Sequence, residues 1–152
     1  LTKGLVWCTG EGEKLRSLHS KDAYAIQLAV KMGFLVCIIS GGSAAGIKER
    51  MNLLGVEHVY THISNKADIL EEFIKKHSLQ HEEILYIGDD IPDLQVMHRV
   101  GVSACPSDAS SDVLSVAHYV SQQPGGMGCV REILERVLKI QHKWYTPEAL
   151  RW

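Results

Sequence analysis

The chain has 152 residues, of which 45% are hydrophobic and 22% charged, so a single globular domain over residues 1–152 is expected. Its 16 Lys and Arg and 18 Asp and Glu give a net charge of −2, so the chain has no overall positive field that would favour nucleic acid or an anionic membrane. No apolar stretch reaches the about 20 residues of a membrane-spanning helix, and the four cysteines form no C-x-x-C pair. The composition therefore predicts a soluble, cytoplasmic protein with small-molecule or protein partners.

Apolar runs of strand length alternate with segments of helical period, a pattern typical of a parallel sheet covered by helices. Before this alternation, residues 5–9 and 14–19 flank a glycine-containing turn and predict a hairpin. Asp22 is expected to cap the first helix and Ser43 to begin the second. Helices are expected between the strands and at 129–140. The expected strands, buried on both faces, cover residues 34–40, 58–63, 82–88, 102–106 and 118–121.

Three carboxylates, Asp89, Asp90 and Asp93, follow the most clearly apolar of these strands. In an open parallel sheet, ligands bind outside the carboxyl ends of the strands. Carboxylates this close repel one another without a cation, and Mg²⁺ suits such a site because it takes one or two carboxylates and keeps several waters. Alternatively, the same residues could cap the next helix without a metal. The segment alone leaves both interpretations open.

Two further groups are expected at the same edge of the sheet. Ser40 and Gly41 come directly after a strand, where a hydroxyl and exposed amides could hold a phosphate oxygen, or could form an ordinary turn. Lys66 begins a helix, a position where the helix dipole disfavours a cation, so it could neutralise a phosphate or simply be solvated. Later in the chain, Gly126 lies in a glycine-rich loop that, together with Arg131, could form either an anion clamp or a turn.

In chain order, S-G-G at 40–42, Lys66 and G-D-D-x-x-D at 88–93 resemble the second, third and fourth motifs of the haloacid dehalogenase superfamily of phosphotransferases. The segments 1–4 and 12–22 and the pattern G-G-x-G-x-x-R-E at 125–132 are similar to its capless branch. That branch contains 3-deoxy-D-manno-octulosonate 8-phosphate (KDO 8-phosphate) phosphatases and relatives that act on nine-carbon acylneuraminate or KDN 9-phosphates. The resemblance covers nearly the whole chain.

This resemblance implies an α/β protein with a three-layer α/β/α Rossmann-like fold, a parallel central sheet, a β-hairpin and no cap domain. It implies a Mg²⁺-dependent sugar-acid phosphatase that works through an aspartyl-phosphate intermediate, and it leaves open whether the sugar has eight or nine carbons. Asp89 would bind the metal. The residues that would take part in catalysis are Ser40, Lys66 and Asp93. Those that would bind substrate are Gly41, Arg50, Gly126 and Arg131.

In the family, a D-x-D-G motif on the central strand precedes L-T-x-G and supplies the nucleophile and the general acid. We therefore expect about 10–15 residues with this motif before Leu1, the length of one strand and its motif. Relatives form homotetramers through the hairpin, which predicts an oligomerisation element at 5–19. The alternative function is that of a non-catalytic tetramerisation domain, of the kind attached to acylneuraminate cytidylyltransferases.

Overall fold

The structure, a computed structural model, describes residues 1–8, 10, 14–42 and 45–151. Residues 11–13 of the expected hairpin turn, residue 9 at the end of the strand expected before it, and the expected helix start at Ser43 lie outside these residues. The strands are β1 (Trp7–Cys8), β2 (Lys14–Leu15), β3 (Cys37–Ile39), β4 (His58–Tyr60), β5 (Leu85–Ile87), β6 (Val102–Cys105) and β7 (Tyr119–Val120). The α-helices are α1 (Ser20–Lys31), α2 (Ala45–Leu53), α3 (Lys66–His77), α4 (Leu94–Met97), α5 (Ser111–Val116) and α6 (Cys129–Ile140). Short 3₁₀ helices are η1 (His81–Glu83), η2 (Ile91–Asp93) and η3 (Pro147–Leu150).

The strands after the hairpin pair in parallel, as the sequence predicts. Strand β3 pairs with β4, with Ile38 opposite Val59, and β5, β6 and β7 form a second sheet in that order. Within the described residues, β3 and β5 do not pair with each other. Both strands are only partly buried, unlike the fully buried strands expected here, and within the described residues each is paired along one edge.

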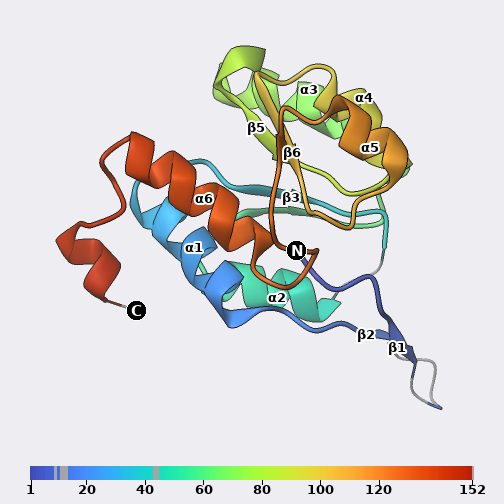
Figure 1. The fold of residues 1–152 in the computed structure, drawn as a ribbon, viewed down its shortest axis with the longest axis horizontal. Coiled ribbons are helices and arrows are strands. Elements are labelled where there is room, and N and C mark those ends of the chain that lie inside the picture. Colours follow the sequence, from blue (N-terminus) through green and yellow to red (C-terminus); the bar gives the residue numbers. More distant parts are fainter. Residues whose placement is uncertain (9, 11–13, 43–44, 152) are drawn as a thin grey trace.

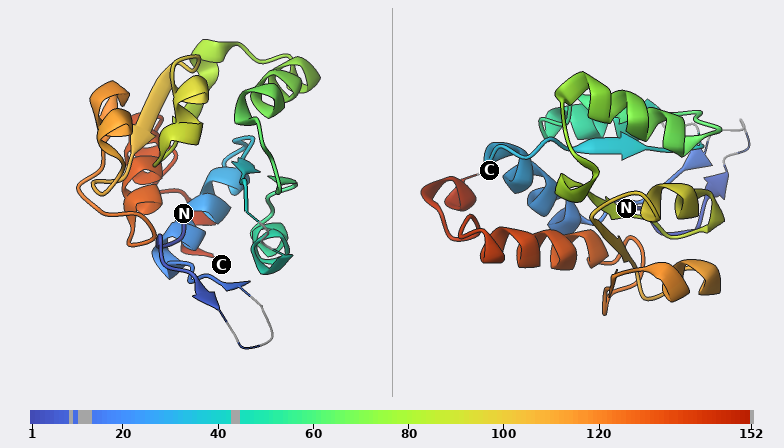
Figure 2. Two further views of the ribbon diagram at one scale, coloured as in Figure 1. Left: turned by 90° about the vertical axis from the view of Figure 1, so that its right-hand side faces the viewer. Right: turned by 90° about the horizontal axis from the view of Figure 1, so that it is seen from above.

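Helices cover both faces of these strands, which confirms the three-layer α/β/α arrangement (Figure 1). On one face, α1, α2 and α6 pack in a cluster that includes Ile38 of β3 and Ile87 of β5 and so joins the two sheets. On the other face, α3, α4 and α5 pack on Tyr86, the residue next to Ile87. The strands therefore run side by side in the middle layer, and their carboxyl ends lie at one edge (Figure 2). None of the described helices has the length and apolarity needed to cross a membrane.

The Asp22 side chain does not cap its own helix, contrary to the expectation. Helix α1 begins at Ser20 after His19 and has no side-chain cap at that position. Asp22 is instead fully buried between α1 and α6, where its carboxylate accepts hydrogen bonds from the N–H groups of Gly128 (3.3 Å) and Arg131 (2.7 Å). It thus caps the start of α6, whose helix positions the glycine-rich loop.

Replacing Asp22 by alanine should lower the free energy of unfolding by about 2–4 kcal/mol, because one buried and one partly buried N–H group lose their acceptor. The matched control is Asp112→Ala, which removes an exposed carboxylate from the first turn of α5 and should cost less than about 1 kcal/mol. Urea unfolding followed by circular dichroism measures both. Equal losses in the two variants would contradict the capping role of Asp22.

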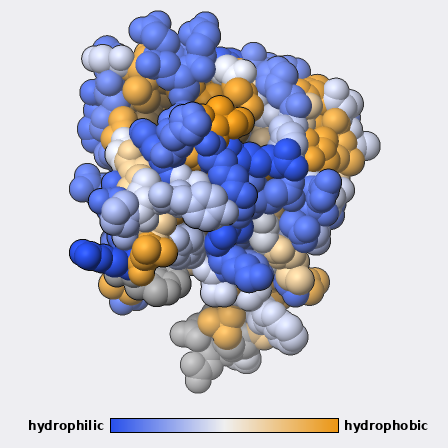
Figure 3. All heavy atoms as spheres, turned by 60° about the vertical axis from the view of Figure 1, so that its left-hand side comes forward, coloured by the Kyte–Doolittle hydropathy of each residue, from blue (hydrophilic) through white to orange (hydrophobic). Residues whose placement is uncertain are grey.

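The hairpin projects from the rest of the molecule (Figures 1 and 2). Its strands pair antiparallel, with Trp7 opposite Leu15, and an isolated bridge joins Thr2 to Leu18. Large apolar side chains on it are exposed, among them Leu5 and Trp7, the latter at 68%. Figure 3 shows hydrophobic residues on this projecting part, and others among the hydrophilic residues of the same face.

Candidate functional site

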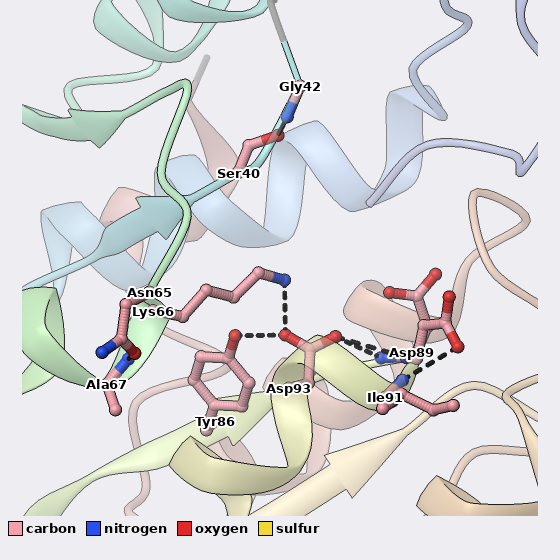
Figure 4. Close-up of polar contacts among 10 residues, drawn as sticks. Ser40, Gly42, Asn65, Lys66, Ala67, Tyr86, Asp89, Ile91 and Asp93 are labelled. Atoms are coloured by element: carbon pink, nitrogen blue, oxygen red, sulfur yellow. Dashed lines mark hydrogen bonds and ion pairs between the residues drawn. The ribbon is translucent and has the colours of Figure 1, made fainter.

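A buried carboxylate, Asp93, forms the centre of the site at the carboxyl end of β5 (Figure 4). It is 2% exposed. Its Oδ1 accepts hydrogen bonds from Lys66 Nζ at 2.6 Å and from the Tyr86 hydroxyl at 2.5 Å. Its Oδ2 accepts bonds from the backbone N–H groups of Asp89 at 3.0 Å and Asp90 at 3.3 Å. Four donors therefore fix the position of this carboxylate.

The chain between β5 and α4 turns sharply in a way that this sequence favours. Gly88 is required because a Cβ there would lie 2.5 Å from the Cβ of Asp93. Asp90 then caps η2 by accepting a hydrogen bond from the N–H of Ile91 at 2.8 Å, and Pro92 suits the first turn that follows. The capping interpretation of this acidic cluster is thus confirmed for Asp90.

Lys66 reaches Asp93 from the first turn of α3. The side chain of Asn65 caps this helix by accepting a hydrogen bond from the N–H of Ala67 at 3.1 Å, so the start of α3 is fixed. The Lys66 side chain is only 16% exposed, and its ammonium group lies where the helix dipole is unfavourable. The ion pair with Asp93 offsets this cost and aims the ammonium group at the edge of the sheet.

Burial and hydrogen bonding fix the protonation states within this group. Burial alone would raise the pKa of Asp93, but the hydrogen bonds from Lys66 and Tyr86 lower it below its ordinary value. Burial, followed by the negative charge of Asp93, raises the pKa of Tyr86. Asp93 is therefore an ionised acceptor and Tyr86 a protonated donor at neutral pH. No motif in the sequence marks Tyr86, although its position one residue before Ile87 places it on the opposite face of β5.

Ser40 lies across from this group, at the end of β3 (Figure 4). Its backbone continues the pairing with β4, because Ser40 N–H donates to the carbonyl of Tyr60 at 2.9 Å. The Ser40 Oγ accepts a hydrogen bond from the N–H of Gly42 at 3.2 Å, which closes the turn. Gly41 and Gly42 are exposed, so the turn presents backbone to solvent at the same edge as Lys66.

Asp89 is the carboxylate that suits a metal ion. Its side chain is exposed and, within the part of the chain that the structure describes, has no hydrogen-bond or ion-pair partner. By contrast, the two oxygens of Asp93 are already bonded to four donors and suit a positioning role. The described residues contain no group of three or more His, Cys, Asp or Glu side chains arranged around one point. Asp89 thus fits Mg²⁺ as a single protein ligand, with the other positions left for water and for further oxygen ligands.

The glycine-rich loop is held by the protein's own carboxylates. Gly125 N–H donates to Asp108 at 2.7 Å, while the N–H groups of Gly128 and Arg131 donate to Asp22, as described above. These three amides are therefore already engaged, which favours the turn interpretation of the loop. Gly126 has a φ of 65°, and a Cβ there would lie 2.2 Å from the backbone nitrogen of Lys3. Gly126 thus lets the loop pack on the N-terminal segment.

The two predicted substrate-binding arginines are not joined to Lys66 and Asp93 by any contact among the described residues. Arg50 is exposed on α2. The guanidinium group of Arg131 lies 4.4 Å from the centre of the Trp144 ring, and its Nε donates to Glu135 at 2.8 Å. The structure therefore brings together Lys66, Asp93 and the backbone of Asp89, and it holds Arg131 against the C-terminal segment.

Comparisons with known proteins identify relatives of the chain. A sequence model of the haloacid dehalogenase-like hydrolases matches residues 55–133. The KDO 8-phosphate phosphatase KdsC of Yersinia pestis is 36% identical over 143 residues, which cover 94% of this chain and 76% of that protein. The enzyme of Escherichia coli strain K12 is 34% identical over the same shares of both chains.

Solved structures agree with these matches. The crystal structure of the Yersinia pestis phosphatase superposes with a TM-score of 0.91 at 36% identity, over 93% of this chain and 77% of that one. The phosphatase of Moraxella catarrhalis, in complex with magnesium, phosphate and KDO, also gives 0.91, at 28% identity over 95% and 83% of the chains. Both curated relatives are named phosphatases, which favours the enzyme over the assembly domain. The chain therefore belongs to the haloacid dehalogenase-like hydrolases and, within them, to the family of the KDO 8-phosphate phosphatases.

Proposed function

We propose that this chain is a Mg²⁺-dependent phosphatase that hydrolyses KDO 8-phosphate, the phosphate ester of an eight-carbon sugar acid. The observation that carries the proposal is the 2.6 Å contact between Lys66 and Asp93, placed beside the exposed carboxylate of Asp89 at the carboxyl edge of the sheet. A fixed cation next to a metal-binding carboxylate suits an anionic phosphoryl group. The identity of the sugar in this proposal is taken from the names of the relatives.

In this proposal, each residue of the site acts on the phosphoryl group through its charge or its hydrogen bonds. Lys66 stabilises the negative charge on the transferring oxygens, and Asp93 holds Lys66 in position. The Ser40 hydroxyl donates to another phosphoryl oxygen while its Oγ keeps the bond from Gly42 N–H. Gly41, Arg50, Gly126 and Arg131 remain proposed substrate-binding residues. Their settings differ, because Arg50 is exposed whereas Arg131 is already paired with Glu135.

Asp89 would hold Mg²⁺, which in phosphoryl transfer neutralises charge on the phosphate oxygens. We further propose that the covalent step uses two carboxylates, the nucleophile and the general acid that the resemblance to the family implies. One carboxylate attacks the phosphorus to form an acyl phosphate, while the other gives a proton to the leaving sugar oxygen. Water then attacks the phosphorus, gives its proton to the second carboxylate and releases phosphate from the first.

A phosphate-release assay tests the function. The natural full-length protein, with its N-terminus established by sequencing, should release phosphate from KDO 8-phosphate in the presence of Mg²⁺ and stop when EDTA is added. A nine-carbon acylneuraminate 9-phosphate serves as the comparison substrate and should be hydrolysed more slowly. If the full-length protein released no phosphate from either ester, the domain would have to be assigned a non-catalytic role.

We also propose that the protein is a homotetramer held together by its hairpins, the segment 5–19. The exposed side chains of Leu5, Trp7 and Leu15 support this assembly, because side chains of this size would otherwise remain in water. A two-stranded hairpin is only marginally stable by itself, so contact with other subunits would stabilise it.

Replacing Trp7 by serine should therefore convert the tetramer to smaller species, measured by light scattering coupled to size-exclusion chromatography. Burial of a large side chain contributes about 1.5–3 kcal/mol, and the loss recurs in every subunit of the assembly. The control is Ile140→Ser, which changes an exposed apolar residue, 79% accessible, at the far end of α6. A Trp7→Ser variant that stayed tetrameric would exclude this interface.

A cytosolic location is proposed on the basis of the thiols. All four cysteines, Cys8, Cys37, Cys105 and Cys129, are free, as is usual in reducing compartments. Burial raises the pKa of Cys37 to about 12, so this thiol is neutral and unreactive at physiological pH.

A further inference from the structure

An arginine of the hairpin lies beside Gly42, in the turn that follows Ser40. Arg16 comes directly after β2 and is exposed. Its Nη1 donates to the Thr2 hydroxyl at 3.4 Å. Its Nη2 lies 4.0 Å from the position that a Cβ on Gly42 would occupy, and the same position is 3.9 Å from the Ser40 Oγ. The guanidinium group and the hydroxyl that we assign to the phosphoryl group therefore both lie beside Gly42, at most about 8 Å from each other.

Gly42 leaves room for this guanidinium group. The backbone of Gly42 does not have the positive φ that would demand glycine, and a Cβ there would make only ordinary contacts. A longer side chain would extend into the space beside Arg16 Nη2. Because Gly42 has no side chain, the space beside Arg16 Nη2 stays open. In the residues that the structure describes, no acidic side chain pairs with Arg16.

We propose that Arg16 binds the carboxylate of the sugar-acid substrate and thereby helps to select it. The proposal rests on the function proposed above, in which the substrate has two anionic groups. Lys66, which is mostly buried and paired with Asp93, serves the phosphoryl group. Arg16 is exposed and has no acidic partner among the residues that the structure describes. Its planar fork of donors matches a carboxylate. Lys66 thus binds the phosphoryl group at one end of the substrate, and Arg16 binds the carboxylate at the other.

The test compares substrates with and without the carboxylate. With KDO 8-phosphate, Arg16→Ala should raise KM by about 10- to 100-fold, which is the usual effect of losing hydrogen bonds to a charged group. With p-nitrophenyl phosphate, which has a phosphate but no carboxylate, the same variant should keep kcat and KM close to those of the parent protein. Arg16→Lys should fall in between, since it keeps the charge and loses the fork. Lys48→Ala, an exposed cation on α2, is the matched control and should change neither substrate.

Two further experiments distinguish a failure of this proposal from a failure of the proposed function. Calorimetric titration with phosphate-free KDO should show the same loss of affinity in Arg16→Ala, whether or not the protein hydrolyses the phosphate ester. Adding Gly42→Arg to Arg16→Ala should restore part of the affinity, because it returns a guanidinium group to the same turn. Equal losses with both phosphate substrates, or an unchanged KM and KDO affinity, would overturn the assignment. A parent protein that bound KDO through Arg16 but released no phosphate would overturn only the proposed function.

Discussion

Lys66→Ala should lower kcat for KDO 8-phosphate by about 10²- to 10³-fold, the usual effect of removing one donor that stabilises transition-state charge. The ammonium group is rigid before substrate binds, because Asp93 holds it at 2.6 Å and the start of α3 is capped by Asn65. Such a prearranged cation stabilises the transition state more than a mobile surface lysine does, because its side chain does not have to be ordered during the reaction. Steady-state phosphate release at saturating substrate measures the effect.

Two other variants show whether the loss is specific to the ammonium group. Lys75→Ala removes an exposed cation from the same helix and should leave kcat unchanged. Tyr86→Phe removes one hydrogen bond to Asp93 while leaving Lys66 in place, so kcat should fall less than in Lys66→Ala. Thermal unfolding of each variant checks that the fold is kept. A Lys66→Ala enzyme within about tenfold of the parent would mean that Lys66 does not face the reacting phosphoryl group.

The elements that the sequence predicts well are those that depend on residues close together in the chain. Helix α6 is found at 129–140, where the sequence places it, because its apolar residues recur with helical period. Gly33 and Gly55 end their helices with a φ of 83° each, a conformation that glycine adopts without strain. Lys66 and Asp93 are also found together, because residues after parallel strands share the carboxyl edge of the sheet.

The features that sequence reasoning missed depend on contacts between distant segments. Asp22 looks like a local helix cap, but its acceptor oxygens bond to Gly128 and Arg131, more than 100 residues later. Arg131 has a motif position that suggests substrate binding, but its stacking on Trp144 depends on how the C-terminal segment folds back. Spacing along the chain reports which residues share a face and not which distant partner they meet. The position of Arg16 beside Gly42 is also set by segments that are distant in the sequence.

The different roles of Asp89 and Asp93 follow from hydrogen bonds that the sequence does not reveal. Asp89 and Asp93 look equivalent in the G-D-D-x-x-D motif. In the structure, Asp93 is buried and bonded to four donors, whereas the Asp89 carboxylate is exposed and contributes only its backbone to the group. A carboxylate saturated with donors is a poor metal ligand, because binding a cation would require it to give up these bonds.

Asp89→Asn should therefore abolish Mg²⁺-dependent phosphate release, with a fall of at least about 10³-fold, because it removes the charge that holds the ion without changing the size of the side chain. A second measurement does not depend on turnover. Mg²⁺ should raise the melting temperature of the parent protein by mass action, and this increase should be lost in Asp89→Asn.

The control for this prediction is the neighbouring residue. Asp90→Asn changes an exposed carboxylate whose structural task, the cap on Ile91 N–H, asparagine can also perform. It should keep both the activity and the Mg²⁺-dependent rise in melting temperature. If Asp89→Asn kept Mg²⁺-dependent turnover while Asp90→Asn lost it, the metal would have to be assigned to Asp90, and the capping role that the geometry gives to Asp90 would be secondary to metal binding.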